Sequence, residues 1–134
     1  MVTTLMTGVP ARDAFVNTVQ SISGRVTPPG TAAVTTYNVK IGTLPAGAVI
    51  LTVTTDIETV LGAGTPTLNV GTTSGGAEIV AAVPAAANSV NSVPIAALVM
   101  PLAADTDIWA NILAGTAPLT GNAYVIVSFI KPAA

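Results

Sequence analysis

The segment Asn122-Ala-Tyr-Val-Ile-Val-Ser-Phe-Ile130 decides the fold class. Its side chains alternate between two faces: Tyr124, Ile126, Ser128 and Ile130 on one, and Ala123, Val125, Val127 and Phe129 on the other. Alternation of β-branched and aromatic residues with a period of two is typical of a strand. Because both faces are apolar, we expect one to pack on a core and the other to contact a neighbour.

The rest of the chain shows the same kind of pattern in shorter segments. Strands are expected over residues 34–41, 48–55, 67–71, 78–83, 96–100 and 107–113. In the first, Tyr37, Val39 and Ile41 share a face; in the second, Val49, Leu51 and Val53 lie opposite Ile50, Thr52 and Thr54. Glycine- and proline-rich turns separate these segments. The sequence therefore predicts an all-β fold, a single β-sandwich or jelly-roll domain of seven or eight short antiparallel strands.

The first 33 residues differ, and we interpret them as an N-terminal arm and connector, with the sandwich spanning residues 34–134. Phe15, Val19 and Ile22 fit helical spacing after Asp13, but the same stretch also fits a strand, and the choice stays open. Residues 25–31, which contain Pro28-Pro-Gly30, are typical of an extended connector.

Charge is scarce in this chain of 134 residues. Asp, Glu, Lys and Arg make up 7% of it, against about 25% in an ordinary soluble domain. A neutral surface loses little desolvation free energy when another protein covers it, so the composition predicts a subunit of an assembly. Four basic residues at a net charge of −2 exclude a phosphate-binding stripe, so no nucleic-acid partner is expected.

The N-terminal sequence lacks the basic and apolar regions of a signal peptide, and every apolar run is too short for a membrane helix, so no membrane partner is expected. Cysteine is absent, which excludes a disulfide scaffold and a cysteine-ligated metal site.

Histidine is also absent, which removes the commonest general base and metal ligand. Two acidic pairs remain, Asp56 with Glu58 and Asp105 with Asp107. They are interpreted as solvated strand ends, with Ca²⁺ binding by a loop as the alternative, and no metal or cofactor is predicted. A small hydrolase using one of the pairs is a third functional hypothesis, since paired carboxylates serve glycoside hydrolysis.

Two further motifs are interpreted as chance matches. Ser128-Phe-Ile-Lys131 fits the S-x-x-K signature of penicillin-recognising enzymes, but on a strand Ser128 and Lys131 point to opposite faces. Gly62-Ala-Gly64 lacks the rest of a dinucleotide fingerprint. We therefore predict that the protein is not an enzyme.

Few aromatic residues are available for protein contacts. Trp109, Tyr37 and Tyr124 are predicted interface residues, with packing in the core as the alternative for each. Arg12 and Arg25 lie in the segment assigned to the arm and are added to this set.

The run Tyr37-Asn-Val-Lys-Ile-Gly-Thr-Leu-Pro-Ala-Gly-Ala-Val-Ile-Leu51, with Thr67-Leu-Asn-Val-Gly71 and Ala103-Ala-Asp-Thr-Asp-Ile-Trp109, resembles small virion proteins of tailed bacteriophages. The resemblance is to the jelly-roll type of capsid cement, or decoration, protein. It covers most of residues 33–131 and rests on strand and turn residues.

The resemblance implies a structural protein on the exterior of a phage capsid, made in the host cytoplasm. Its partners would be the major capsid protein and further copies of itself, as a homodimer or homotrimer. The alternative function is a carbohydrate- or receptor-binding β-sandwich module of a phage fibre or head appendage.

Overall fold

The computed structural model describes residues 18–30, 35–59, 61–62, 65–84, 89–93, 100–113 and 119–132. In these residues the regular elements are strands: β1 (Gln20–Val26), β2 (Thr36–Leu44), β3 (Val49–Thr59), β4 (Thr67–Gly71), β5 (Val80–Pro84), β6 (Ser89–Val93), β7 (Thr106–Leu113) and β8 (Asn122–Ile130). The all-β prediction is confirmed. The described segments contain no helix that is long and apolar enough to cross a membrane.

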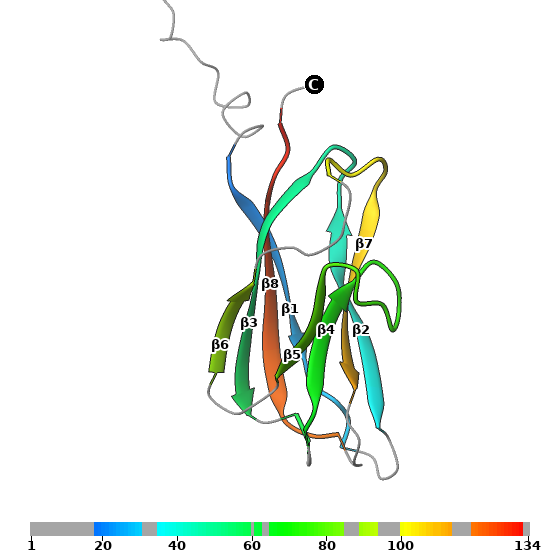
Figure 1. Cartoon of the computed structure of the whole chain (residues 1–134), viewed down its shortest axis with the longest axis vertical. Helices are drawn as coiled ribbons and strands as arrows, with labels where there is room; N and C mark the ends of the chain where they lie inside the picture. Colours follow the sequence, from blue (N-terminus) through cyan, green and yellow to red (C-terminus); the bar gives the residue numbers. More distant parts are fainter. Residues whose placement is uncertain are drawn as a thin grey trace, which may run out of the picture.

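The strands form two four-stranded sheets that face each other (Figure 1). Sheet A has the order β1-β8-β3-β6, and sheet B has the order β2-β7-β4-β5. The antiparallel pairs β1 with β8, β2 with β7, β3 with β6 and β4 with β5 are nested in the sequence. Nested pairs that wrap into two sheets are the strand pattern of a jelly roll.

The core fills the space between the sheets because each strand turns one apolar face inward. Along β8 every second residue, from Ala123 to Phe129, is buried, and Tyr124, Ile126, Ser128 and Ile130 lie on the outer face. In sheet B the inward residues of β7 are Ile108, Ala110 and Ile112. Leu61, Ile79, Leu102 and Leu119, which lie outside the strands, complete the core. Burial of these side chains supplies the main stabilising free energy.

The pattern predicted for residues 48–55 is wrong at one point. Ile50 and Val53 are both buried, whereas Leu51 between them is 40% exposed. A register shift in the pairing of β3 with β8 between Ile50 and Thr52 explains the difference, because a bulge adds one residue and reverses the alternation. The tertiary partner sets the bulge, so the spacing of apolar residues does not reveal it.

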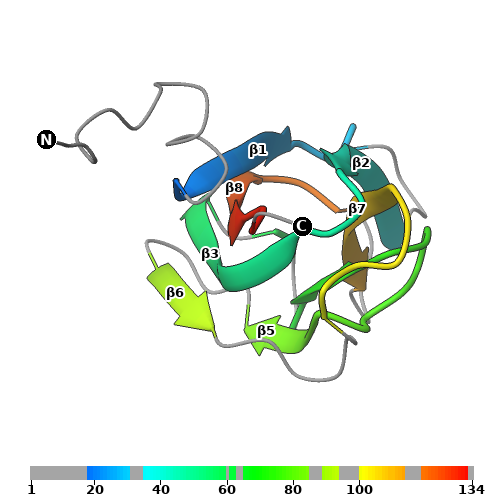
Figure 2. The ribbon, with the colours of Figure 1, turned by 90° about the horizontal axis from the view of Figure 1, so that it is seen from above.

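The sandwich is closed where β1 packs against β2, and these strands lie side by side in Figure 2. A Cβ atom on Gly24 would lie 2.8 Å from Cδ1 of Ile41, and one on Gly42 would lie 3.2 Å from Cδ1 of Ile22. Each glycine therefore leaves room for an isoleucine of the opposite strand. The packing covers one edge of each sheet, which is one way that β proteins protect edges from other chains.

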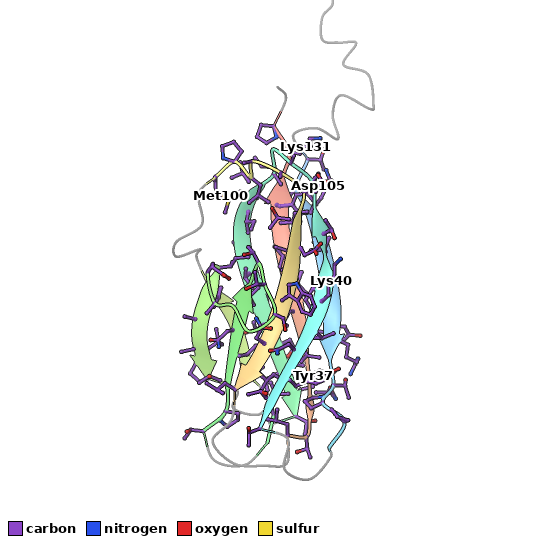
Figure 3. All side chains as sticks on the ribbon, turned by 90° about the vertical axis from the view of Figure 1, so that its right-hand side faces the viewer. Tyr37, Lys40, Met100, Asp105 and Lys131 are labelled. Carbon is purple, nitrogen blue, oxygen red and sulfur yellow. The ribbon has the colours of Figure 1, made fainter. Side chains whose placement is uncertain are left out.

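One end of the sandwich is built by two segments that hydrogen-bond to each other. The amide of Gly47 donates to the carbonyl of Leu102 at 2.7 Å, and the amide of Leu102 donates to the carbonyl of Ala48 at 2.9 Å. The carboxylate of Asp105 accepts the amide of Ala46 at 2.9 Å. Figure 3 shows Met100, Asp105 and Lys131 together at this end, away from Tyr37.

The N-terminal boundary of the sandwich differs from the prediction. Residues 20–26, which the sequence places in the arm, form β1 and pair with β8 over seven residues. The choice between helix and strand is thereby resolved in favour of a strand for this part. Residues 1–17, including Arg12, and residues 31–34 lie outside the described residues.

Two other strands also differ from the prediction. β5 begins at Val80 rather than residue 78, and β6 occupies Ser89–Val93, between the strands expected over residues 78–83 and 96–100. β6 is formed by antiparallel pairing with β3. Most of the strand expected over residues 96–100 lies outside the described residues.

Candidate functional site

The two outer faces of the sandwich are the candidate sites for binding other molecules. On sheet A, cross-strand neighbours form rows along the outer face: Ser21, Ser128 and Thr52 in one row, and Ser23, Ile126 and Thr54 in the next. The two β1 serines are exposed, and the other four residues are half-buried. Short hydroxyl and branched side chains leave this part of the face without charge, which suits contact with another protein surface.

A polar cluster lies further along the same face. The guanidinium of Arg25 donates to Glu58 Oε1 at 2.9 Å and to Asn122 Oδ1 at 3.0 Å. It also lies 4.3 Å from the centre of the Tyr124 ring. The Tyr124 side chain and, after it, Glu58 raise the pKa of Arg25. The cluster joins β1, β3 and β8, and the charges of Arg25 and Glu58 cancel within it.

On sheet B, Trp109 of β7 lies on the outer face between Lys40 of β2 and Gly71 of β4. The Lys40 ammonium lies 3.0 Å from Asp107 Oδ1, and the Thr43 hydroxyl donates to the same carboxylate at 2.8 Å. Thr43 and then Lys40 lower the pKa of Asp107. The charges beside Trp109 therefore cancel locally.

The loop between β4 and β5 folds over sheet B and is held by Asn111. This side chain is 3% exposed, although it lies on the outer face of β7. Its Nδ2 donates to the carbonyls of Gly76 at 2.7 Å and Thr73 at 3.3 Å, and its Oδ1 accepts the amide of Gly75 at 3.0 Å. One amide thus satisfies three backbone groups of the loop, because it carries both donors and an acceptor.

Glu78 is itself a residue of this loop, and its carboxylate also holds the loop in place. Its carboxylate accepts the amide of Thr72 at 2.9 Å and the hydroxyl of Thr73 at 3.4 Å. The Thr72 amide, followed by the amide of Glu78 itself, lowers the pKa of Glu78. Glycine is required at 71, since a Cβ there would collide with the Glu78 carboxylate and the Gly76 backbone.

A shallow pocket of about 180 Å³ opens on this face beside the loop. Its lining includes Thr36, Asn38, Asn69, Gly75, Asn111 and Leu113. Asn38, Asn111 and Asn69 are direct cross-strand neighbours on β2, β7 and β4, so their amides lie in one row. The pocket therefore has a neutral wall of amide side chains, of which Asn111 is already bonded to the loop.

The predicted interface residues lie in different surroundings. Trp109 is half-buried on sheet B, and Tyr124 is half-buried on sheet A beside Arg25. Tyr37 instead packs against the core from the edge of sheet B. The structure thus places two of the aromatic residues on outer faces, and these faces belong to different sheets.

Glu58, Asp105 and Asp107, three of the four carboxylates of the acidic pairs, have separate contacts. Asp56 and Glu58 share the outer face of β3, as predicted for a continuing strand, and Glu58 binds Arg25. Asp105 and Asp107 lie at the start of β7 in sheet B, where each accepts its own hydrogen bond. Among the described residues, no group of three or more acidic side chains is placed to hold a metal ion.

The amide row and the Glu78 contacts were not predicted from the sequence. Asn38, Asn69 and Asn111 come from three distant segments and meet only because of the strand register. The sequence does show that each asparagine occupies the polar face of a segment with alternating side chains. That pattern places each residue on an outer face but does not bring the three together.

A comparison with solved structures links this fold to a phage capsid. A chain of the structure described as the "Cyanophage Pam1 capsid asymmetric unit" aligns with a TM-score of 0.66 and 26% sequence identity, over 88% of this chain and 88% of that chain. The protein is similar to a phage capsid chain. Because the aligned part is the same share of both, the two chains have about the same length. No protein-family model and no curated protein matches the sequence.

Proposed function

We propose that this protein is a structural component of a phage virion, a cement or decoration subunit that binds the outer surface of the capsid. The observation that carries the proposal is the similarity to a chain of a cyanophage capsid asymmetric unit over 88% of both chains. The match covers nearly all of a small chain rather than one domain of a large one. A small chain of this kind fits a subunit that attaches to a lattice made by other proteins.

The electrostatics of the outer faces supports a role in protein contacts. Arg25 is paired with Glu58 on sheet A, and Lys40 is paired with Asp107 on sheet B. The hydroxyl rows of sheet A add polar groups that need no counter-charge. When a capsid subunit covers these two ion pairs, neither pair leaves an unpaired ion in the interface.

The rigidity of the sandwich supports the same role. The strands are connected by antiparallel pairing, the β1 and β2 edges are packed together, and hydrogen bonds fix the turn around Gly47 to Leu102. A preorganised body loses little conformational entropy when it binds. Its binding free energy is therefore available to hold neighbouring capsid subunits together.

In this proposal the protein stabilises the shell through thermodynamic linkage between its own binding and capsid assembly. A subunit that binds the assembled lattice and not the free capsid protein shifts the equilibrium away from disassembly. Many weakly bound copies on one particle add to the effect. The proposed partners are the major capsid protein and further copies of this chain, as a homodimer or homotrimer, on the capsid exterior after synthesis in the host cytoplasm.

The proposed role requires no catalysis. The chain has no histidine, and Glu58, Asp105 and Asp107 accept hydrogen bonds within the sandwich. Thr43 and then Lys40 lower the pKa of Asp107, which moves it away from the range near the operating pH that general acid–base work needs. We therefore propose a non-enzymatic function.

Reconstitution on empty capsids tests the proposal. Capsids assembled without this protein should bind the purified chain to saturation and should then disassemble at a higher temperature. Thr54→Lys places a charge on the outer face of sheet A, and Asn38→Lys does so on sheet B; both positions lie outside the core. One of them should lose capsid binding, because an unpaired lysine in an interface is costly. Failure of the unmodified chain to bind capsids would contradict the proposal.

A further inference from the structure

The pocket on sheet B has a defined arrangement of groups. The pocket lies over two rows of cross-strand neighbours. Asn38, Asn111 and Asn69 line it from one row, and Thr36 and Leu113 line it from the next, where Thr67 lies on the other side of Leu113. The first row presents amides, and the second places a leucine between two hydroxyl groups. Gly75, in the loop that Asn111 holds, forms a further wall.

The amides of Asn111 and Asn69 are fixed by the fold. Asn111 is held by three backbone groups of the loop, and the Oδ1 of Asn69 accepts the amide of Ala82 at 2.5 Å. That bond orients the Asn69 amide and leaves its Nδ2 group for another acceptor. Asn38 is exposed on the opposite side of the row. The Asn111 amide is used by the loop and is buried, so a ligand meets the oriented Nδ2 group of Asn69 and the exposed amide of Asn38.

Leu113 gives the pocket an apolar side. Its side chain is 54% exposed, although the neighbouring Ile112 is almost fully buried. The exposed leucine can contact the C–H groups of a ligand. The threonines beside it suit a ligand that also carries hydroxyl groups. Pockets that combine an apolar surface with a few fixed polar groups are typical of small-molecule sites.

Other classes of ligand fit the pocket less well. β7 is paired on both sides, so its backbone cannot accept an added peptide strand. The nearest described cation on this face, Lys40, is paired with Asp107, and the lining has no charged side chain, which disfavours phosphates and other ions. A neutral ligand rich in hydroxyl groups fits the amides of Asn38 and Asn69, the hydroxyl of Thr36 and the apolar side of Leu113. We propose that this pocket binds a sugar unit of a neutral saccharide.

This binding would be an activity in addition to the structural role proposed above, and it does not depend on that role. A single shallow pocket supports a dissociation constant in the mM range for one sugar unit. Many copies displayed on one particle would raise the apparent affinity for a glycan-bearing surface by about 10²- to 10⁴-fold. The expected ligand on such a surface is a neutral polysaccharide or a glycan terminus.

Nuclear magnetic resonance of the purified chain tests the site directly. The probes are the methyl glycosides of glucose, galactose and mannose, together with N-acetylglucosamine; galacturonate and glucosamine serve as charged counterparts. At least one neutral sugar should cause saturable shifts of the Nδ2 signals of Asn38 and Asn69. The charged counterparts should bind more weakly.

Two variants check the assignment. Asn38→Ala and Leu113→Ala both change exposed side chains, and each should weaken binding about three- to tenfold. Thr54→Ala on sheet A is the matched control and should bind like the unmodified chain. The inference is overturned if no neutral sugar shifts the pocket signals, if the shifts lie on sheet A, or if a charged sugar binds more tightly. None of these results depends on capsid binding.

Discussion

Gly24 of β1 lies directly beneath Ile41 of β2, and a Cβ atom on the glycine would lie 2.8 Å from Cδ1 and 3.4 Å from Cα of that isoleucine. Ile22 occupies the matching position over Gly42. This reciprocal packing of glycine and isoleucine closes the sandwich on the side where its two sheets meet without backbone pairing. It therefore makes the fold sensitive to small increases in volume.

Gly24→Val should destabilise the protein by about 1–3 kcal/mol, because the added methyl groups meet Cα of Ile41 as well as its movable end. For a domain of this size that corresponds to about 3–6 °C in Tm per kcal/mol. Gly24→Ala should cost less, since only the Cδ1 methyl group must move. Thermal unfolding measures both. Ser23→Val, on the exposed side of the same strand, is the control and should change Tm little.

Asn111→Ala should free the loop between β4 and β5. Three backbone groups of the loop lose their partner, and the expected destabilisation is about 1–3 kcal/mol. Hydrogen exchange gives the sharper result: the Gly75 amide should exchange much faster, whereas the Gly47 amide, bonded to Leu102, should not change. Equal protection of Gly75 in both proteins would show that Asn111 does not hold the loop.

Glu78 should make the loop sensitive to acid. The pKa of Glu78 is lowered in the folded protein, below the ordinary range of a glutamate. Its contribution to stability is therefore present at neutral pH. That contribution is lost as the pH falls through the folded-state pKa. Glu78→Gln should unfold at a lower temperature at pH 7 and should show a smaller decrease in Tm on acidification. Parallel curves of Tm against pH for the two proteins would contradict this role.

Thr55→Val should stabilise the protein by about 1 kcal/mol. The Thr55 hydroxyl is buried in the core, and among the described residues it has no hydrogen-bond partner. Valine has nearly the same shape and removes the desolvation cost of the hydroxyl. Urea unfolding measures the gain, with Thr54→Val on the outer face as the control, expected within about 0.5 kcal/mol of the unmodified chain. A loss of stability on Thr55→Val would reveal a partner for the hydroxyl.

The alternation of side chains between two faces was sufficient to predict the central strands. Asn122–Ile130 and Thr67–Gly71 have the bounds expected from their sequence, since their apolar faces are uninterrupted. The exposure of Leu51 could not be predicted, because the bulge beside it arises from the register with β8. Ser89–Val93 is a strand through its pairing with β3, and its sequence between Pro84 and Pro94 gave weak local signal.

The candidate site was less accessible to prediction than the fold. The low charge predicts few ions on the outer faces, where Arg25 pairs with Glu58 and Lys40 pairs with Asp107. The alternating pattern around Trp109 allowed a surface position for it. The alignment of Asn38 with Asn111 and Asn69 depends on which strands become neighbours. Likewise, the contact of Glu78 with Thr72 depends on how the loop folds back over Gly71. Both are consequences of tertiary structure.

A side-chain-resolution reconstruction of the intact phage particle tests the central claim most directly. The proposal predicts density for this sandwich on the outside of the capsid, over joints between major capsid protein subunits, at a copy number fixed by the capsid symmetry. The account would be contradicted if particles from a host that produces the protein carried no copy of it on the shell.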